Sequence, residues 1–152
     1  MSKKIWLILI FITLFSGCGF KPILSTSDYN FSLKLDDVKG DNDLTKFIKF
    51  NLNRYQNINS EIFYISIQSS YEKNALSKNK SGKIIEFSII SITEVKIRNN
   101  NKEKNISLIN EANMTNISDN YDEKIYERNI KQSFANKITK DLIIEILNFD
   151  DN

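Results

Sequence analysis

Residues 85–97 read IEFSIISITEVKI, and this stretch decides the class of fold. Apolar residues recur at every second position from Ile85 to Ile97, with Ser91 and Thr93 as the polar members of that side. A period of two places alternate side chains on opposite faces of a β-strand. The stretch therefore predicts one long strand that buries one face against a core.

Three shorter stretches, residues 29–35, 61–68 and 106–114, have the same period of two. In the last of them, Asn110 alone interrupts the apolar side. Each stretch predicts a strand with one buried face. Together with residues 85–97 they predict four strands, of which the last three form a meander.

Polar stretches separate the predicted strands. Residues 36–40 are expected to end the first strand. Residues 71–82, in which Lys, Asn and Ser alternate, are expected to form a loop. Residues 99–105 are expected to form the tip of a hairpin.

Two further stretches have helical periodicity. Apolar residues at helical spacing follow Asp41 and Asp43, either of which can cap a helix that continues to Tyr55. Residues 121–149 predict a long amphipathic helix, because neither proline nor glycine interrupts the pattern. Phe134 lies in the apolar stripe of this helix and is expected to be buried.

The predicted elements follow the order β-α-β-β-β-α. Because each helix has one apolar stripe and each strand one apolar face, we expect an α+β fold built as a two-layer sandwich. Two helices then pack on one face of a four-stranded mixed sheet. The other face is expected to be polar, with Tyr64 and Tyr71 as candidate contact residues on it.

The N-terminal stretch reads as an export signal, since lysines precede an apolar run from Ile5 to Phe15. Ser16 and Gly17 then stand directly before the only cysteine. Small residues at this place match a bacterial lipobox, so Cys18 is the predicted lipidation site. A plain secretory signal, with Cys18 as a bystander, is the alternative.

The chain is therefore expected to divide into a signal peptide at 1–17, a lipidated tether at 18–28 and a single α+β domain at 29–152. The apolar run of the signal is shorter than the roughly 20 residues that a membrane-spanning helix needs. Attachment to the membrane is expected through the lipid. Gly19, rather than an aspartate, follows the cysteine, which favours the outer membrane.

Composition excludes several classes of function. The chain has no histidine and one cysteine, so it lacks the usual general base and zinc ligand and cannot close an intramolecular disulfide. With 21 basic and 19 acidic residues, loss of the two lysines of the signal leaves a mature chain of zero net charge. We expect no cofactor, no metal, no nucleic-acid partner and no enzymatic activity. A hydrolase that uses carboxylates is the enzymatic alternative.

Basic residues cluster around the last predicted hairpin: Lys96, Arg98, Lys102 and Lys104. Three more lysines lie in the preceding predicted loop: Lys78, Lys80 and Lys83. Lysine and arginine donate charge-assisted hydrogen bonds to phosphate oxygens, so the first four are a candidate site for an anionic lipid. The alternative is a charged sheet edge that prevents aggregation.

The run Cys18-Gly19-Phe20-Lys21-Pro22-Ile23 resembles the start of the lipopolysaccharide-assembly lipoprotein family (LptE). The Gly40-Asp41 entry to the first helix and the long last helix after Tyr126 extend the resemblance over the mature chain. It implies a lipoprotein on the periplasmic side of the outer membrane that partners and plugs the lipopolysaccharide-translocon barrel. It also implies roles in assembly of that barrel and in lipopolysaccharide transport, with lipopolysaccharide bound directly. The alternative is an accessory lipoprotein of another envelope machine, such as barrel assembly or secretin piloting.

Overall fold

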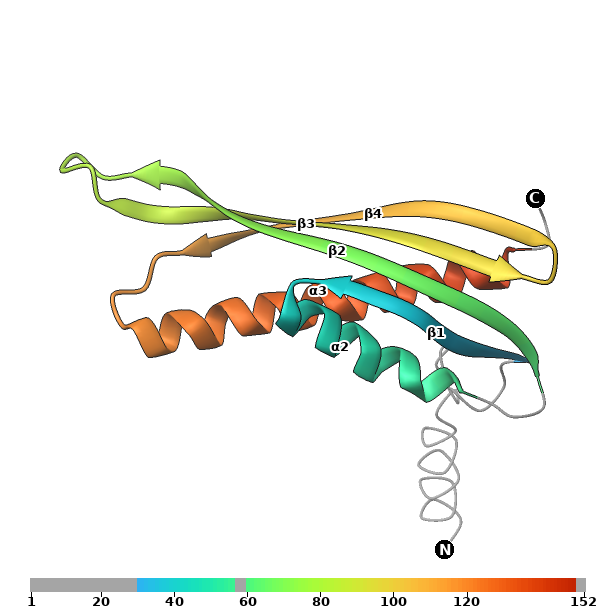
Figure 1. Cartoon of the computed structure of the whole chain (residues 1–152). Helices are drawn as coiled ribbons and strands as arrows, with labels where there is room; N and C mark the ends of the chain where they lie inside the picture. Colours follow the sequence, from blue (N-terminus) through green and yellow to red (C-terminus); the bar gives the residue numbers. More distant parts are fainter. Residues whose placement is uncertain (1–29, 57–59, 150–152) are drawn as a thin grey trace, which may run out of the picture.

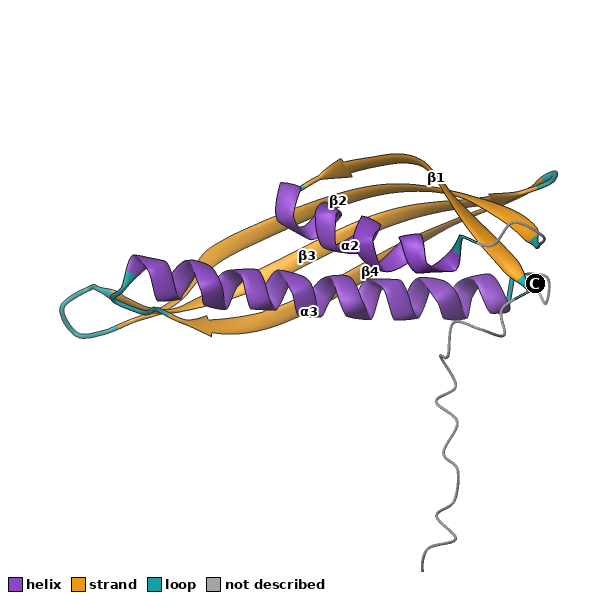
Figure 2. Ribbon diagram, turned by 90° about the horizontal axis from the view of Figure 1, so that it is seen from below, coloured by secondary structure: helices purple, strands orange, loops and turns teal. Residues whose placement is uncertain are grey.

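One four-stranded sheet and two helices on one of its faces make up the fold (Figure 1). The computed structural model describes residues 30–56 and 60–149. The elements are β1 (Phe31–Gly40), α2 (Asn42–Leu52), the short 3-10 helix η1 (Asn53–Tyr55), β2 (Glu61–Lys78), β3 (Ile84–Asn99), β4 (Lys102–Thr115) and α3 (Asn120–Leu147). Figure 2 shows both helices on the same side of the sheet. The predicted element order and two-layer α+β fold are confirmed.

The strands lie in the order β1-β2-β3-β4. β1 pairs with β2 in parallel, whereas β2 with β3 and β3 with β4 are antiparallel, so the sheet is mixed as predicted. Two consecutive parallel strands need a crossover connection. Helix α2 supplies it and thereby comes to lie against the sheet beside α3.

The core lies between the sheet and the two helices. Along α3 the buried residues recur every four positions from Ile130 through Phe134, Ile138 and Leu142, which confirms the predicted stripe and the burial of Phe134. Both helices and all four strands contribute buried apolar side chains, which include Leu33, Leu44, Ile48, Phe63, Ile65, Ile89, Val95, Ile97, Met114 and Ile143. No helix of the described residues is both long and apolar enough to cross a membrane.

The junction between β1 and α2 depends on a glycine. Gly40 has φ of +125°, and a Cβ built there would lie 1.8 Å from the carbonyl oxygen of Ser69 on β2. Asp41 follows and caps α2, since its Oδ1 accepts a hydrogen bond of 3.0 Å from the Leu44 amide. Of the two predicted caps, Asp41 is therefore the residue that acts, and Asp43 lies in the first turn.

Two strands are longer than predicted. β1 does not end at Asp36 but continues, after an irregularity between Leu35 and Asp37, to Gly40. The predicted loop at 71–82 is wrong for most of its length, because β2 continues to Lys78 in antiparallel pairing with β3. This far part of the hairpin extends beyond the core, and Leu76 and Ile85 are about half exposed there. Backbone pairing holds it, and the alternation of half-buried and exposed residues that continues from Tyr71 to Asn74 is lost in the residues that follow.

The predicted hairpin tip at 99–105 is also too long. β3 ends at Asn99 and β4 begins at Lys102, so the turn is reduced to Asn100 and Asn101. Asn100 has φ of 48°, in the left-handed region that asparagine tolerates better than most residues. Pairing of β3 with β4 shows no register shift, so Asn110 keeps its place on the helix side and is buried.

The two glycines with positive φ give a matched test of the β1–α2 junction. We expect Gly40→Ala to lower the free energy of unfolding by about 3 kcal/mol or more, because the new Cβ collides with the β2 backbone. Gly82→Ala should cost only about 1 kcal/mol, since open space surrounds that position and only φ is unfavourable. Urea denaturation followed by circular dichroism measures both. Equal losses would show that the close approach of Gly40 to Ser69 is not a constraint.

Candidate functional site

The four basic residues predicted to bind an anionic lipid do not come together on one face. Lys96 and Arg98 alternate with buried residues of β3 and lie on the face opposite the helices. Lys102 and Lys104 pair across the ladder with buried Asn99 and Ile97, which places them on the helix side. They belong to strand β4 rather than to a hairpin tip.

Acidic partners compensate the charges of Lys96, Arg98 and Lys104. Lys96 pairs with Glu103 at 2.7 Å, and Lys104 of β4 pairs with Glu145 of α3 at 2.9 Å. Arg98 pairs with Asp36 at 2.8 Å. Exposed ion pairs are weak, so a strong anion can still compete for these cations. Lipopolysaccharide binding by this set stays a prediction.

The lysines of the other hairpin lie at the far end of β3. Lys78 ends β2, and Lys80 and Lys83 flank the tight turn to β3. The side chain of Asn79 holds this turn, since its Oδ1 accepts hydrogen bonds from the amides of Ser81 (3.0 Å) and Lys83 (2.9 Å). Because the two turns lie at opposite ends of β3, these lysines cannot share a ligand with Lys102 and Lys104 unless it spans the sheet.

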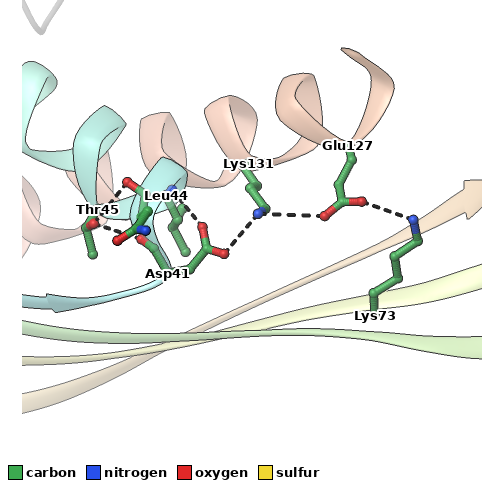
Figure 3. Close-up of polar contacts among 7 residues, drawn as sticks. Asp41, Leu44, Thr45, Lys73, Glu127 and Lys131 are labelled. Atoms are coloured by element: carbon green, nitrogen blue, oxygen red, sulfur yellow. Dashed lines mark hydrogen bonds and ion pairs between the residues drawn. The ribbon is translucent and has the colours of Figure 1, made fainter. Parts of the chain in front are cut away.

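A chain of alternating charges connects β2, α2 and α3, and we call it the ion chain (Figure 3). Lys131 of α3 lies 2.9 Å from Oδ2 of Asp41 and 3.6 Å from Oε1 of Glu127. Glu127 in turn contacts Nζ of Lys73 on β2 at 3.0 Å, and Lys73 also pairs with Glu123. The ion chain therefore joins the start of α2 and the first half of α3 to the middle of the sheet.

The members of the ion chain are largely withdrawn from water. The Lys131 side chain is 10% exposed, and those of Lys73, Glu123 and Glu127 are 20–23% exposed. Burial lowers the pKa of Lys73, but its hydrogen bonds to Glu123 and Glu127 and their charges outweigh burial, so the pKa lies above its usual range. Removal of one member leaves its partner buried and unpaired, which is costly.

Tyr71 lies beneath the ion chain, on the helix side of the sheet. The prediction that it lies on the open face is therefore wrong. Tyr71 continues the series of odd-numbered β2 residues that face the helices and pairs with Ser91 of β3. The ammonium of Lys131 lies 4.2 Å from the centre of its ring. Burial and the negative charge of Glu127 raise the pKa of the Tyr71 hydroxyl.

Tyr71, Ser91 and Asn110 form a row across β2, β3 and β4 beneath α3. The hydroxyl of Ser91 and the amide of Asn110 are buried and have no hydrogen-bond partner among the described residues, and the Tyr71 hydroxyl faces the Glu127 carboxylate without a hydrogen bond of standard geometry. A buried polar atom without a partner destabilises a fold by about 1–3 kcal/mol. This row therefore weakens the packing of α3 on the sheet. The ion chain holds α3 to the sheet at the same place.

A basic groove lies between α2 and α3 above the ion chain. It has a volume of about 610 Å³ and is lined by Asp43, Lys46, Lys124, Glu127, Arg128 and Lys131. The Arg128 guanidinium lies 5.7 Å from the centre of the Phe47 ring, so an aromatic side chain of α2 supports it. Sequence reasoning missed this groove, although Lys124, Arg128 and Lys131 recur at intervals of four and three and so share one face of a helix.

The groove and the ion chain offer cations and hydrogen-bond donors. Within residues 30–56 and 60–149, no group of three His, Cys, Asp or Glu side chains is placed to hold a metal ion. The arrangement suits recognition of an anion through charge-assisted hydrogen bonds. Cys18 lies outside the described residues.

No protein-family model and no curated protein matches this sequence. Solved structures do match its fold. The rare lipoprotein B of Shewanella oneidensis matches with a TM-score of 0.56 and 12% sequence identity, over 77% of this chain and 99% of that one. An uncharacterized lipoprotein B of Nitrosomonas europaea matches with a TM-score of 0.50 and 13% identity, over 88% of this chain and 94% of that one. At these identities the comparison shows a shared fold.

The environment of Tyr71 predicts a late ionisation at alkaline pH. The unfolded chain ionises its tyrosines near pH 10, whereas folded Tyr71 keeps its proton to a higher pH. Its contribution to stability is therefore complete below about pH 10 and is lost as the pH rises from there through the raised pKa. Absorbance titration near 295 nm should show a late tyrosine step, and Tyr71→Phe should remove it. Loss of an ordinary early step in that variant would contradict the burial of Tyr71.

Proposed function

We propose that this protein is a lipid-anchored lipoprotein of the outer membrane that partners and plugs the lipopolysaccharide-translocon barrel from the periplasmic side. In this role it aids assembly of the barrel and the transport of lipopolysaccharide to the cell surface. The observation that carries the proposal is the fold, which this chain shares with two bacterial proteins named as lipoprotein B. The lipobox that ends at Cys18 supplies the anchor.

The open face of the sheet supports a contact with a hydrated wall. Polar groups there pair across the strands, as in the 2.8 Å hydrogen bond from Ser107 of β4 to Glu94 of β3. Tyr64 lies on the same face, with Lys34 and Arg98 near its ring. The lumen of a membrane barrel is polar, so a plug meets it with polar and aromatic side chains spread over a wide area.

Isolated apolar residues interrupt this polar face. Ile92 of β3 and Ile109 of β4 pair directly across the ladder and are 37% and 57% exposed. They lie between Ser70 on one side and open solvent beyond the sheet edge on the other. A small apolar strip surrounded by polar residues resembles a protein interface, in which an apolar centre is surrounded by a polar rim.

The proposed role is binding rather than catalysis. The chain has no histidine, and the partly buried carboxylates of the ion chain, Asp41, Glu123 and Glu127, are held by its lysines. A carboxylate paired in this way stabilises structure and is poorly placed to exchange protons with a substrate. Direct contact with lipopolysaccharide is part of the proposal and does not need a catalytic group.

Cell fractionation and co-purification test the anchor and the partner together. The wild-type chain should incorporate labelled palmitate, and Cys18→Ser should not, because only the thiol accepts the lipid. Purification of the tagged wild type from detergent-solubilised outer membrane should bring down the lipopolysaccharide-translocon barrel in stoichiometric amount. Ser16→Ala is the matched control, since it keeps a small residue in the lipobox.

Two results would contradict the proposal. Equal palmitate labelling of wild type and Cys18→Ser would remove the lipobox assignment. Recovery of a different envelope machine in place of the translocon barrel would favour an accessory lipoprotein of that machine.

A further inference from the structure

Three cations of the basic groove have no acidic partner within the part of the chain that the structure describes. Lys46 comes from α2, and Lys124 and Arg128 come from successive turns of α3. All three are exposed, and no acid of the described residues forms an ion pair with them. They differ in this respect from Lys96, Arg98 and Lys104, each of which has an acid within 3 Å.

The charge of the groove can be counted from its lining residues. Lys131 and Glu127 compensate each other within the ion chain. Asp43 is the remaining acid of the lining, so it and the three unpartnered cations leave a net charge of about +2. This local charge stands out because the mature chain as a whole is expected to be neutral.

The walls of the groove are fixed before any ligand arrives. Asp41 and Lys131 join the start of α2 to α3 at 2.9 Å, and Asn51 of α2 donates a hydrogen bond of 2.9 Å to Asn136 of α3. Phe47 supports the Arg128 guanidinium from the α2 side. The helices that carry the cations are therefore already in place and Phe47 restrains Arg128, so binding has to order mainly the two lysine side chains.

We propose that the groove between α2 and α3 binds a phosphate monoester, with Lys46, Lys124 and Arg128 as its ligands. A phosphate monoester carries a charge of about −1.5 to −2 at pH 7 and has three strong acceptor oxygens. Its charge and its acceptors match three cations in a site of net charge near +2. Carboxylates and phosphodiesters, which carry a single negative charge, leave part of the groove charge uncompensated.

The phosphate can belong to a lipid head group or to a soluble molecule, and the test separates these sources. The inference goes beyond the proposed function, because it requires no barrel partner. Full-length protein in dodecyl maltoside micelles is titrated with three probes: phosphatidic acid, phosphatidylglycerol and glycerol 3-phosphate. We expect phosphatidic acid, a monoester, to bind at least about tenfold more tightly than phosphatidylglycerol, a diester. Comparable affinity for glycerol 3-phosphate assigns the site to soluble monoesters, and weak binding of it assigns the site to lipid.

A matched pair of variants locates the binding. The combined change Lys46→Gln, Lys124→Gln and Arg128→Gln should weaken monoester binding at least about tenfold, through loss of charge-assisted hydrogen bonds. The control changes Lys49, Lys137 and Lys140 to Gln, which removes three exposed cations of the same helices from outside the groove lining. Its binding should change less than about twofold. If the triple groove variant lacks the circular dichroism spectrum of the folded protein, the single variant Arg128→Gln replaces it. We expect this single change to weaken monoester binding at least about threefold.

Two outcomes would overturn the inference. Equal losses in the groove variant and the control would show that binding follows total charge. Equal affinity for phosphatidic acid and phosphatidylglycerol would show that the groove does not recognise a monoester. Either result can occur while co-purification of the barrel succeeds, so failure here is distinguishable from failure of the proposed function.

Discussion

The buried ammonium of Lys131, held between Asp41 and Glu127, is the contact on which the arrangement of the helices depends. Asp41 follows β1 at the start of the crossover, caps α2 and pairs with Lys131, so one carboxylate holds both the start of α2 and the position of α3. Glu127 passes the connection on to Lys73 of the sheet. Loss of any member of the ion chain leaves the charge of its partner unpaired in a site with little water. We therefore expect the members of the ion chain to stabilise the fold as one unit.

This polar connection divides the interface between α3 and the sheet into two parts of different character. From Phe134 onward, α3 packs through an apolar stripe that includes Ile138 and Leu142. Before Phe134, the ion pairs of Glu123, Glu127 and Lys131 add to the apolar contacts of Ile130, next to the buried polar row of Tyr71, Ser91 and Asn110. The basic groove lies against this first part, so its ligand-binding cations stand on the half of α3 whose position depends on charge. Ligand binding and the attachment of α3 are therefore expected to influence each other.

Most of the fold could be predicted from the sequence, because an element that buries one face has apolar residues at a regular spacing. Alternation around Phe63 and Val95 and the four-residue repeat through Phe134 indicated the strands and the last helix. The far half of the β2–β3 hairpin could not be predicted, since strand pairing without burial leaves no period in residues such as Leu76. Tyr71 was assigned to the wrong face because the strand around it was taken to be a loop, although its odd position continues the helix-side series of Phe63, Ile65 and Ile67.

The candidate site was less accessible to sequence reasoning than the fold. The basic residues clustered near the β3–β4 turn were visible in the sequence. Their division between the two faces of the sheet depends on strand pairing, and an acidic partner such as Glu145 comes from a distant segment. The helical stripe of Lys124, Arg128 and Lys131 was a usable signal. This stripe forms a basic groove only together with Lys46, and only the packing of α2 against α3 brings Lys46 beside it.

A double-mutant cycle on Asp41 and Lys131 measures how strongly this ion pair couples the start of α2 to α3. Asp41→Asn keeps a residue that caps helices well, and Lys131→Met keeps an apolar stem of similar length, so the cycle isolates the ion pair. Free energies of unfolding from urea denaturation give the coupling energy. We expect a coupling of about 2 kcal/mol, because the pair is largely buried and anchors two helices. A coupling below about 0.5 kcal/mol, typical of exposed pairs, would contradict this expectation.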